Sequence, residues 1–209
     1  MAFKYSRWAI FTVWLFHISA LLGISLGFEA WFVEKTPLNL LISSTLLFLV
    51  YPINSPGKYF SFLVFWTGGM LAEWIGVHYG VLFGSYSYGA NLGPKIDGIP
   101  VLIGVNWALL TFITGSIATY LSKNDTLQLF LGASLMVLLD FFMEQNASRF
   151  DFWSFEGNIV PLKNYICWFL LALLFQWVLK RNKITGHLPF SAHLFTAQLL
   201  FFVYFYLWF

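Results

Sequence analysis

The chain has 209 residues, of which 59% are hydrophobic and only 10% are charged, and its mean hydropathy is +0.75. A soluble fold of this size cannot hide so much apolar surface, whereas a lipid bilayer accepts it. The formal net charge of +2 is small and the basic residues are dispersed, which excludes a nucleic-acid partner. We therefore expect an integral membrane protein whose surroundings are the lipid bilayer.

Seven apolar segments in chain order predict about seven transmembrane helices. The first, residues 8–28, is long enough to span, and because no small-x-small cleavage site follows it we interpret it as a retained helix. A proline lies near the start of several of the others, where a missing N–H costs least. The remaining helices are expected at 37–52, 60–80, 100–122, 126–147, 161–180 and 189–209. The prediction is an all-α polytopic helical bundle that forms a single transmembrane domain over residues 1–209.

Two longer connections, residues 81–99 and 148–160, hold most of the polar residues that could form a site. With seven spans, seven of the 11 Lys and Arg residues fall on the N-terminal side of the membrane and four on the other. By the positive-inside rule this places the N-terminus in the cytoplasm and both long connections outside.

Acidic and aromatic residues recur with the same spacing in helices three to six. Two aromatic residues lie 13 and 15 positions after each of two acids: Tyr86 and Tyr88 after Glu73, and Trp153 and Phe155 after Asp140. Each half then has a proline, an asparagine and a tryptophan: Pro100, Asn106 and Trp107, and Pro161, Asn164 and Trp168. This spacing predicts a parallel internal repeat of helices three–four and five–six, with chance correspondence as the alternative. Repeat interfaces often carry the sites of membrane proteins.

Carboxyl groups inside membrane helices are costly, about 2.5–3.5 kcal/mol each at a helix centre, and therefore point to function. The candidates are Glu73, Asp140 and Glu144, with Glu29 as a fourth at the outer end of the first helix. Asp140 and Glu144 are four residues apart and share a helical face. Glu73 lies on a stripe of glycines that permits close approach of another helix or a ligand: Gly69, Gly76 and Gly80. All four acids are expected in the outer half of the membrane, where they could line one pocket.

Two interpretations of these acids stay open. They could pair with Arg149, Lys163 or asparagine side chains and simply lock helices together. Alternatively, a buried acid that lacks a cation stays protonated and serves as a proton donor at neutral pH.

The number and positions of the histidine, lysine and cysteine residues exclude several classes of membrane protein. His17, His78, His187 and His193 form no HxxH or HxxxH set, so a di-iron hydroxylase is not expected and no metal site is predicted. The last helix contains no lysine, which excludes a retinal protein. Cys167 is the only cysteine and gets no role. His17 is interpreted as a core residue, and His78, near Glu73, as a supporting residue of the site.

The residues around these acids resemble a known family. Phe83-Gly84-x-Tyr86-x-Tyr88, then Gly98-Ile99-Pro100 and Asn106-Trp107, resemble the carotenoid biosynthesis membrane proteins that act as carotenoid hydratases. The same holds for Asp140 and Glu144 with Trp153-x-Phe155, Asn164 and Trp168, so the resemblance covers residues 70–170. Gln145 and Phe155 depart from it, since proline and tryptophan are expected there. The resemblance implies addition of water to the terminal C=C of an acyclic carotenoid end group, giving a tertiary alcohol, with no cofactor.

The chemistry of alkene hydration fits the candidate residues. A buried acid protonates the alkene, aromatic faces stabilise the tertiary carbocation, and a second carboxylate takes a proton from the attacking water. We expect Asp140 to be the acid and Glu73 its partner and water base, or the reverse, with Glu144 third. The expected substrate-binding residues are Tyr86, Tyr88, Asn106, Trp107, Trp153, Asn164 and Trp168. Arg149 is expected to set the pKa of Glu144, with Glu29 as a further supporting residue.

Two other functions remain open at this point. A proton-initiated cyclase of the lycopene type would use the same acid and cation but release a proton, so its product would keep the mass of the substrate. A non-enzymatic carotenoid-binding or lipid-binding scaffold or transporter would change no product at all. The expected partners are the carotenoid, water and other membrane enzymes of the carotenoid pathway, and the expected location is the bacterial cytoplasmic (inner) membrane.

Overall fold

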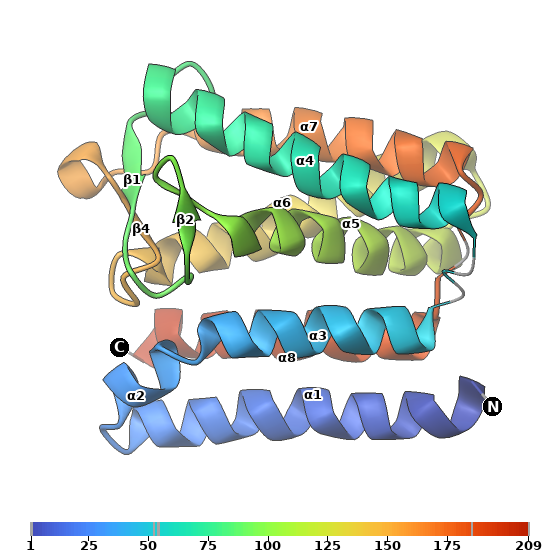
Figure 1. Ribbon diagram of the computed structural model, residues 1–209, viewed down its shortest axis with the longest axis horizontal. Helices are drawn as coiled ribbons and strands as arrows, with labels where there is room; N and C mark the ends of the chain where they lie inside the picture. Colours follow the sequence, from blue (N-terminus) through green and yellow to red (C-terminus); the bar gives the residue numbers. More distant parts are fainter. Residues whose placement is uncertain (1, 52, 54, 185, 209) are drawn as a thin grey trace.

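Long helices that lie side by side form most of the protein, as the computed structural model shows for residues 2–51, 53, 55–184 and 186–208 (Figure 1). The helices are α1 (Ala2–Ser25), α2 (Glu29–Val33), α3 (Thr36–Val50), α4 (Pro56–Tyr79), α5 (Val101–Leu121), α6 (Asp125–Ala147), α7 (Leu162–Arg181) and α8 (Leu188–Trp208). Within the described ranges, seven helical segments are long and apolar enough to cross a membrane, with α2 and α3 together making one of them. The predicted all-α polytopic bundle is therefore confirmed.

Prolines and glycines set the helix boundaries. Pro100 and Pro161 are the N-cap residues of α5 and α7, and Pro56 opens α4, four residues earlier than expected. Helix α1 begins six residues before the expected start and ends at Ser25, because the chain then turns at Gly27 with a φ of +93°. The second span begins earlier than predicted, at Glu29, since the short helix α2 precedes α3.

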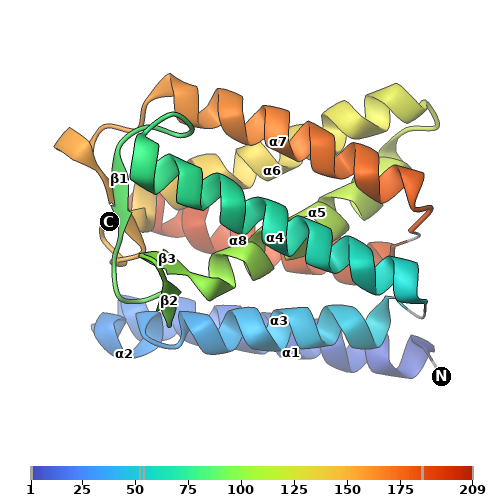
Figure 2. The same cartoon turned by 45° about the horizontal axis from the view of Figure 1, so that its top comes forward.

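Helix α5 is the centre of the bundle. It packs against α3, α4, α6, α7 and α8, and it is buried along most of its length. In Figure 1 it lies between α4 and α7 above and α3 and α8 below, and Figure 2 shows it running obliquely to α4. The outer helices expose leucine and phenylalanine side chains, as lipid-facing surfaces do.

The two long connections contain short β-strands, which lie at the end of the bundle opposite the N-terminus (Figure 1). Strand β1 (Tyr86–Tyr88) pairs antiparallel with β4 (Trp153–Phe155), and β2 (Lys95–Ile96) pairs with β3 (Ile99–Pro100). A 3₁₀ turn, η1 (Glu156–Asn158), follows β4. The pairing of β1 with β4 fixes the first connection to the second directly over the ends of α4 to α7.

The strand register agrees with the predicted internal repeat. Tyr86 faces Phe155 and Tyr88 faces Trp153, with the two equivalent serines, Ser87 and Ser154, opposite each other at the centre. A twofold relation produces this crosswise pairing of equivalents. The equivalent tryptophans behave in the same way: Trp107 and Trp168 stack with ring centroids 3.6 Å apart and an interplanar angle of 17°.

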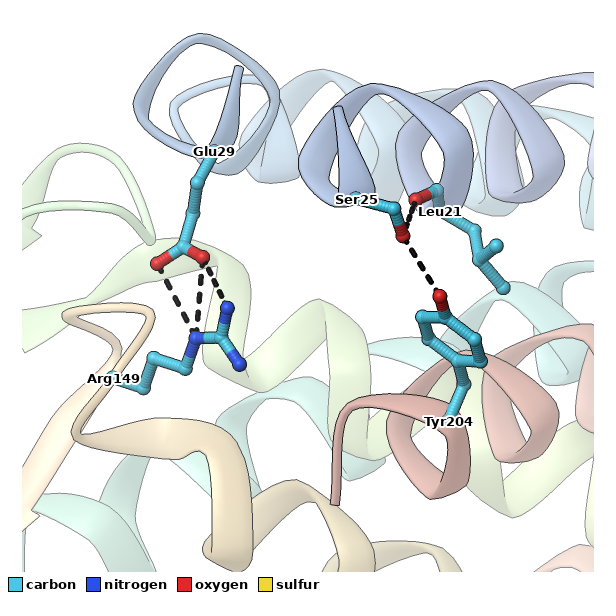
Figure 3. A network of polar contacts seen from close by, with 5 residues as sticks. All are labelled: Leu21, Ser25, Glu29, Arg149 and Tyr204. Atoms are coloured by element: carbon cyan, nitrogen blue, oxygen red, sulfur yellow. Dashed lines mark hydrogen bonds and ion pairs between the residues drawn. The ribbon is translucent and has the colours of Figure 1, made fainter. Parts of the chain in front are cut away.

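Polar contacts hold the peripheral helix α1 to the rest of the bundle. Glu29 is the first residue of α2, just after α1. Its carboxylate oxygen Oε2 accepts hydrogen bonds from Nε and Nη2 of Arg149, at 3.1 and 2.5 Å (Figure 3). Ser25 Oγ lies 3.0 Å from the Tyr204 hydroxyl of α8 and donates to the Leu21 carbonyl. These contacts tie the C-terminal end of α1 and the start of α2 to the end of α6 and to α8.

Glu29→Gln is expected to loosen this attachment. The pair is about one-third exposed, so its loss should cost about 1 kcal/mol. For a chain of this size that corresponds to a fall of roughly 2–4 °C in the thermal unfolding midpoint, measured by fluorescence in detergent. Glu34→Gln is the matched control, because Glu34 is more exposed and its ion pair with Lys35 is long, at 3.9 Å, and therefore weak. Equal midpoints for both variants would contradict the expectation.

Candidate functional site

Glu73 of α4 lies in a cage of three hydrogen-bond donors. Its Oε2 accepts from the hydroxyls of Tyr86 (2.5 Å) and Tyr88 (2.7 Å) on β1, and its Oε1 accepts from Trp107 Nε1 (2.8 Å) on α5. The side chain is only 3% exposed. Burial, and next the charge of Glu73, raise the pKa of Tyr86 and of Tyr88 well above the usual range, so both hydroxyls keep their protons and donate. A carboxyl group that receives three donors is arranged to be a carboxylate.

Asp140 and Glu144 of α6 form the second half of the cluster. The Asn164 amide of α7 donates to both, at 3.4 Å to Asp140 Oδ2 and 2.9 Å to Glu144 Oε1. Glu144 Oε2 also accepts from Trp153 Nε1 of β4 at 2.6 Å. Asp140 is fully buried, and its Oδ1 has no hydrogen-bond partner in the part of the chain that the structure describes. One carboxyl oxygen of this cluster is therefore left without a donor and is the natural place for a proton.

The three acids belong to one cluster: Asp140 and Glu144 share the Asn164 amide. The Trp153 ring that binds Glu144 contacts the Tyr88 ring that binds Glu73. The donors that reach them are neutral hydroxyl, indole and amide groups. Like charges that share a buried site cannot all be present at once, so the cluster retains at least one proton. A buried set of carboxyl groups that holds both a proton and a carboxylate can donate a proton in one step and accept one in another.

Aromatic rings surround the acids. Phe83 lies 6.4 Å from Trp107 and 6.5 Å from Trp168 between ring centroids, beside their stack. Tyr86 packs on Phe155 at 5.2 Å, and Tyr88 contacts Trp153 at 6.1 Å. Ring faces of this kind attract a cation by about 2 kcal/mol or more when water is excluded.

Phe83 has an unusual backbone. It is buried with a φ of +64°, and the amide of Gly84 donates to the Leu82 carbonyl at 2.7 Å, so Phe83 is the centre of a three-residue turn. A bulky residue in this region is strained, and such strain is concentrated at functional sites. The turn holds the Phe83 ring against the tryptophan pair. The sequence analysis names Phe83 only as part of a motif. The glycine that follows it, Gly84, was the one sequence feature that could have indicated a turn at this position.

The glycine stripe of α4 makes room for the cage of Glu73, as expected. A Cβ on Gly69 would lie 2.7 Å from the Trp107 side chain, and one on Gly76 would lie 2.7 Å from the Tyr86 hydroxyl. Gly80 ends the helix with a φ of +59°. The first two glycines therefore allow the donors of Glu73 to approach α4.

Gly69→Ala is expected to displace the Trp107 indole from Glu73 and to destabilise the protein by roughly 1–3 kcal/mol, the usual cost of overpacking. Gly57→Ala in the same helix is the matched control, because a Cβ there meets no atom within 4 Å. Thermal unfolding and intrinsic tryptophan fluorescence should change for Gly69→Ala and stay as in the parent for Gly57→Ala. A Gly69→Ala protein with unchanged fluorescence and stability would contradict this packing.

Three supporting residues make contacts other than those predicted. Glu29 and Arg149 form an ion pair with each other, which ties the region between α1 and α2 to the end of α6. His78 lies 3.3 Å from Asp97 and stacks on Trp74, whereas the donors to Glu73 are Tyr86, Tyr88 and Trp107. No group of three or more His, Cys, Asp or Glu suited to a metal ion occurs among the described residues.

A cavity of about 500 Å³ adjoins the cluster. Of the described residues that line it, none is one of the three acids, but its wall includes Trp153, which binds Glu144, and Met143, the neighbour of Glu144. Asn106, expected to hold water or a carboxyl group, also faces this cavity, next to Trp107 in the sequence. The cavity and the acid cluster therefore share a wall.

The comparison with protein families finds a match over most of the chain. A family model described as carotenoid biosynthesis protein matches residues 36–209, from the start of α3 to the end of the chain. The match includes all three acids and each of their hydrogen-bond donors. No curated protein and no solved structure matches the chain. The chain belongs to the carotenoid biosynthesis protein family.

Proposed function

We propose that this membrane protein is a carotenoid hydratase, a hydro-lyase that adds water to the terminal C=C of an acyclic carotenoid end group. The observation that carries the proposal is Asp140, a fully buried acid whose Oδ1 has no hydrogen-bond partner among the described residues, in one cluster with a glutamate that accepts three hydrogen bonds. This pairing supplies the proton donor and the proton acceptor that hydration requires. Acids held in different environments at one site commonly divide these roles.

The first step is protonation of the alkene. The Asp140 O–H gives its proton to the less substituted carbon of the terminal C=C, whose π electrons form the new C–H bond. A tertiary carbocation remains at the more substituted carbon. Glu144 shares the Asn164 amide with Asp140, and this contact orients the acid. The faces of Trp107, Trp168 and Phe83 stabilise the cation.

The second step is capture of the cation by water. A water oxygen forms the C–O bond and loses a proton to the Glu73 carboxylate, which gives the tertiary alcohol. The substrate has gained H and OH, and a proton that moves from Glu73 back to Asp140 restores the starting state. Tyr86 and Tyr88 hold the Glu73 carboxylate in position throughout. Residues of the chain supply every proton transfer, so the proposed reaction uses no cofactor.

The proposed setting is the bacterial cytoplasmic membrane with the N-terminus in the cytoplasm. The acid cluster then lies toward the outer side, at the end that β1 and β4 cover. The substrate enters from the lipid phase, where other membrane enzymes of the same pathway would deliver it.

Pigment mass tests the proposal. The chain is expressed in bacteria that accumulate an acyclic or monocyclic carotenoid, and the extract is analysed by mass spectrometry. Hydration predicts a new pigment heavier by one water for each end that reacts. An isomer of unchanged mass would instead indicate the cyclase, which uses the same acid and cation. Unchanged pigment in well-expressed cells would contradict both enzymes and favour a carotenoid-binding scaffold or a transporter.

A further inference from the structure

A second pocket lies at the end of the bundle opposite the acid cluster. It has a volume of about 990 Å³ and forms where α5 and α7 end and where α6 and α8 begin, at the right in Figure 1. Of the described residues that line it, none belongs to the acid cluster or donates to it. The strands β1 and β4 are at the other end of the bundle, so a ligand in this pocket would be well separated from the candidate site.

Positive charge is concentrated in this pocket. Four of the 11 Lys and Arg residues of the chain are in its lining: Lys123, Lys180, Arg181 and Lys183. The one acid in the described lining is Asp125, which forms an ion pair with Lys180 at 2.8 Å. The lining therefore has a clear excess of positive charge, which attracts a negatively charged group.

Lys180 is fixed in position by residues of α6. Its Nζ donates to Gln128 Oε1 at 2.6 Å in addition to its ion pair with Asp125. Gln128 is only 9% exposed, and its Nε2 donates to the Ser122 carbonyl at 2.8 Å. The acid of the pocket is therefore paired with one ordered cation, and the other three basic residues supply the excess charge.

Lys183 occupies a backbone position that usually takes glycine or asparagine. It follows Asn182, the C-cap of α7, and has a φ of +49°. The amides of Lys183 and Ile184 donate to the carbonyls of Lys180 and Leu179, which closes the helix as a Schellman motif. A lysine adopts the left-handed conformation at a cost that glycine does not have and asparagine has to a smaller degree. The end of the helix does not by itself favour lysine here, whereas the charge of the pocket does.

The rest of the pocket has an apolar character. Trp177 is 47% exposed, and the Arg181 guanidinium lies 5.3 Å from the centre of its ring. Tryptophan together with basic residues is typical of the boundary between membrane and water. The apolar residues of the lining are Leu129, Trp177, Leu179, Ile184 and Leu188. A ligand that has a negatively charged head and an apolar chain would match both parts of this lining.

We propose that this pocket binds the phosphate group of an anionic membrane lipid. Phosphate oxygens accept hydrogen bonds from lysine and arginine N–H groups, and basic pockets between transmembrane helices are suited to such head groups. A free phosphate ion could use the same cations but would leave the apolar lining uncovered, so it should bind more weakly. The inference concerns binding alone and is independent of the proposed hydration.

The test measures lipid binding by native mass spectrometry of the full chain in detergent. We expect one phosphatidylglycerol molecule to remain bound, with an affinity at least about tenfold higher than that of phosphatidylcholine. Each cation near an anionic head group contributes about fivefold in affinity, so Lys123→Gln with Lys183→Asn should weaken phosphatidylglycerol binding by about 25-fold. Lys58→Gln is the matched control, because Lys58 is in the first turn of α4, at the same end of the bundle but outside the described lining.

Lys183→Asn alone separates binding from folding. Asparagine suits a positive φ, so this protein should unfold without lipid at the parental temperature or slightly above it, and still lose about fivefold in phosphatidylglycerol affinity. Parental affinity in this variant and in the double variant would overturn the inference.

Two further outcomes would also overturn it. Equal retention of phosphatidylglycerol and phosphatidylcholine would show that the pocket does not select an anionic head group. A loss in Lys58→Gln as large as that in the double variant would indicate diffuse attraction by surface charge and not a pocket. Inorganic phosphate is the third arm: if it raised the thermal unfolding midpoint as much as phosphatidylglycerol does, the ligand would be a free anion and the lipid would be excluded.

Discussion

Asp140→Asn is expected to reduce the rate of carotenoid hydration by about 10²–10⁴-fold, the usual contribution of a general acid. The amide has nearly the same shape and keeps an oxygen that can accept from Asn164, so the packing around it should persist. It cannot deliver a proton to an alkene. The rate is measured as the amount of water adduct formed per unit of membrane protein, with protein amount determined by immunoblotting.

The matched control for this acid is Glu156→Gln. Glu156 is an exposed acid in the turn η1, and it lies in the connection that covers the cluster. The control should retain the parental rate, which shows that loss of a negative charge in this region is not itself the cause. An Asp140→Asn protein that is present in normal amount and forms the adduct at the parental rate would remove Asp140 from the proton-donating role.

Glu73→Gln is expected to reduce the rate by at least about 10²-fold, because the water base is lost. The glutamine oxygen can still accept from Trp107 Nε1, and the amide N–H groups can donate to the hydroxyls of Tyr86 and Tyr88, which reverse their own roles. The cage can therefore stay intact while its centre can no longer take a proton. We expect a folded protein whose thermal unfolding midpoint lies within a few degrees of the parental value. It should bind the pigment but not hydrate it.

Tyr88→Phe provides a graded comparison for Glu73. It removes one of three donors to the carboxylate and leaves the base in place. A hydrogen bond to a charged group contributes about 1.5–3 kcal/mol, so the expected loss is about 10–100-fold, smaller than that of Glu73→Gln. A larger loss from Tyr88→Phe than from Glu73→Gln would show that the glutamate only anchors the strand β1.

The transmembrane helices could be predicted from the sequence because hydropathy and proline act locally. Pro100 and Pro161 mark the starts of α5 and α7 to within a residue. The start of α1 was missed because its first turns are polar, and an apolar window starts only at Trp8. Helix α2 was missed because a five-residue helix is too short to produce a periodic pattern.

The contacts of the acid cluster were partly predictable. The repeated spacing grouped Glu73 with its tyrosines and Trp107 in one half, and Asp140 with Asn164 in the other. The structure brings each group into contact, but the individual hydrogen bonds were not predicted. Their roles in a reaction remain predictions. The pairing of Arg149 with Glu29 depends on how α1 rotates against α6, which no local pattern encodes.

The remaining features of the site depend on tertiary structure. The pairing of β1 with β4 joins segments that are far apart in the chain, and three-residue strands carry too little pattern to be recognised. The cavity beside the acid cluster becomes visible only when α1 and α8 are placed around it.

The most direct test of proton-initiated hydration uses labelled solvent. Purified protein in nanodiscs is supplied with an acyclic carotenoid in water enriched in both ¹⁸O and deuterium, and the pigment is analysed by mass spectrometry after the hydroxyl hydrogen has been exchanged back. The account predicts one ¹⁸O and one non-exchangeable deuterium per hydrated end, on adjacent carbons, and neither label in the Asp140→Asn protein. A product that carries deuterium but no ¹⁸O, or a pigment that takes up neither label, would contradict it.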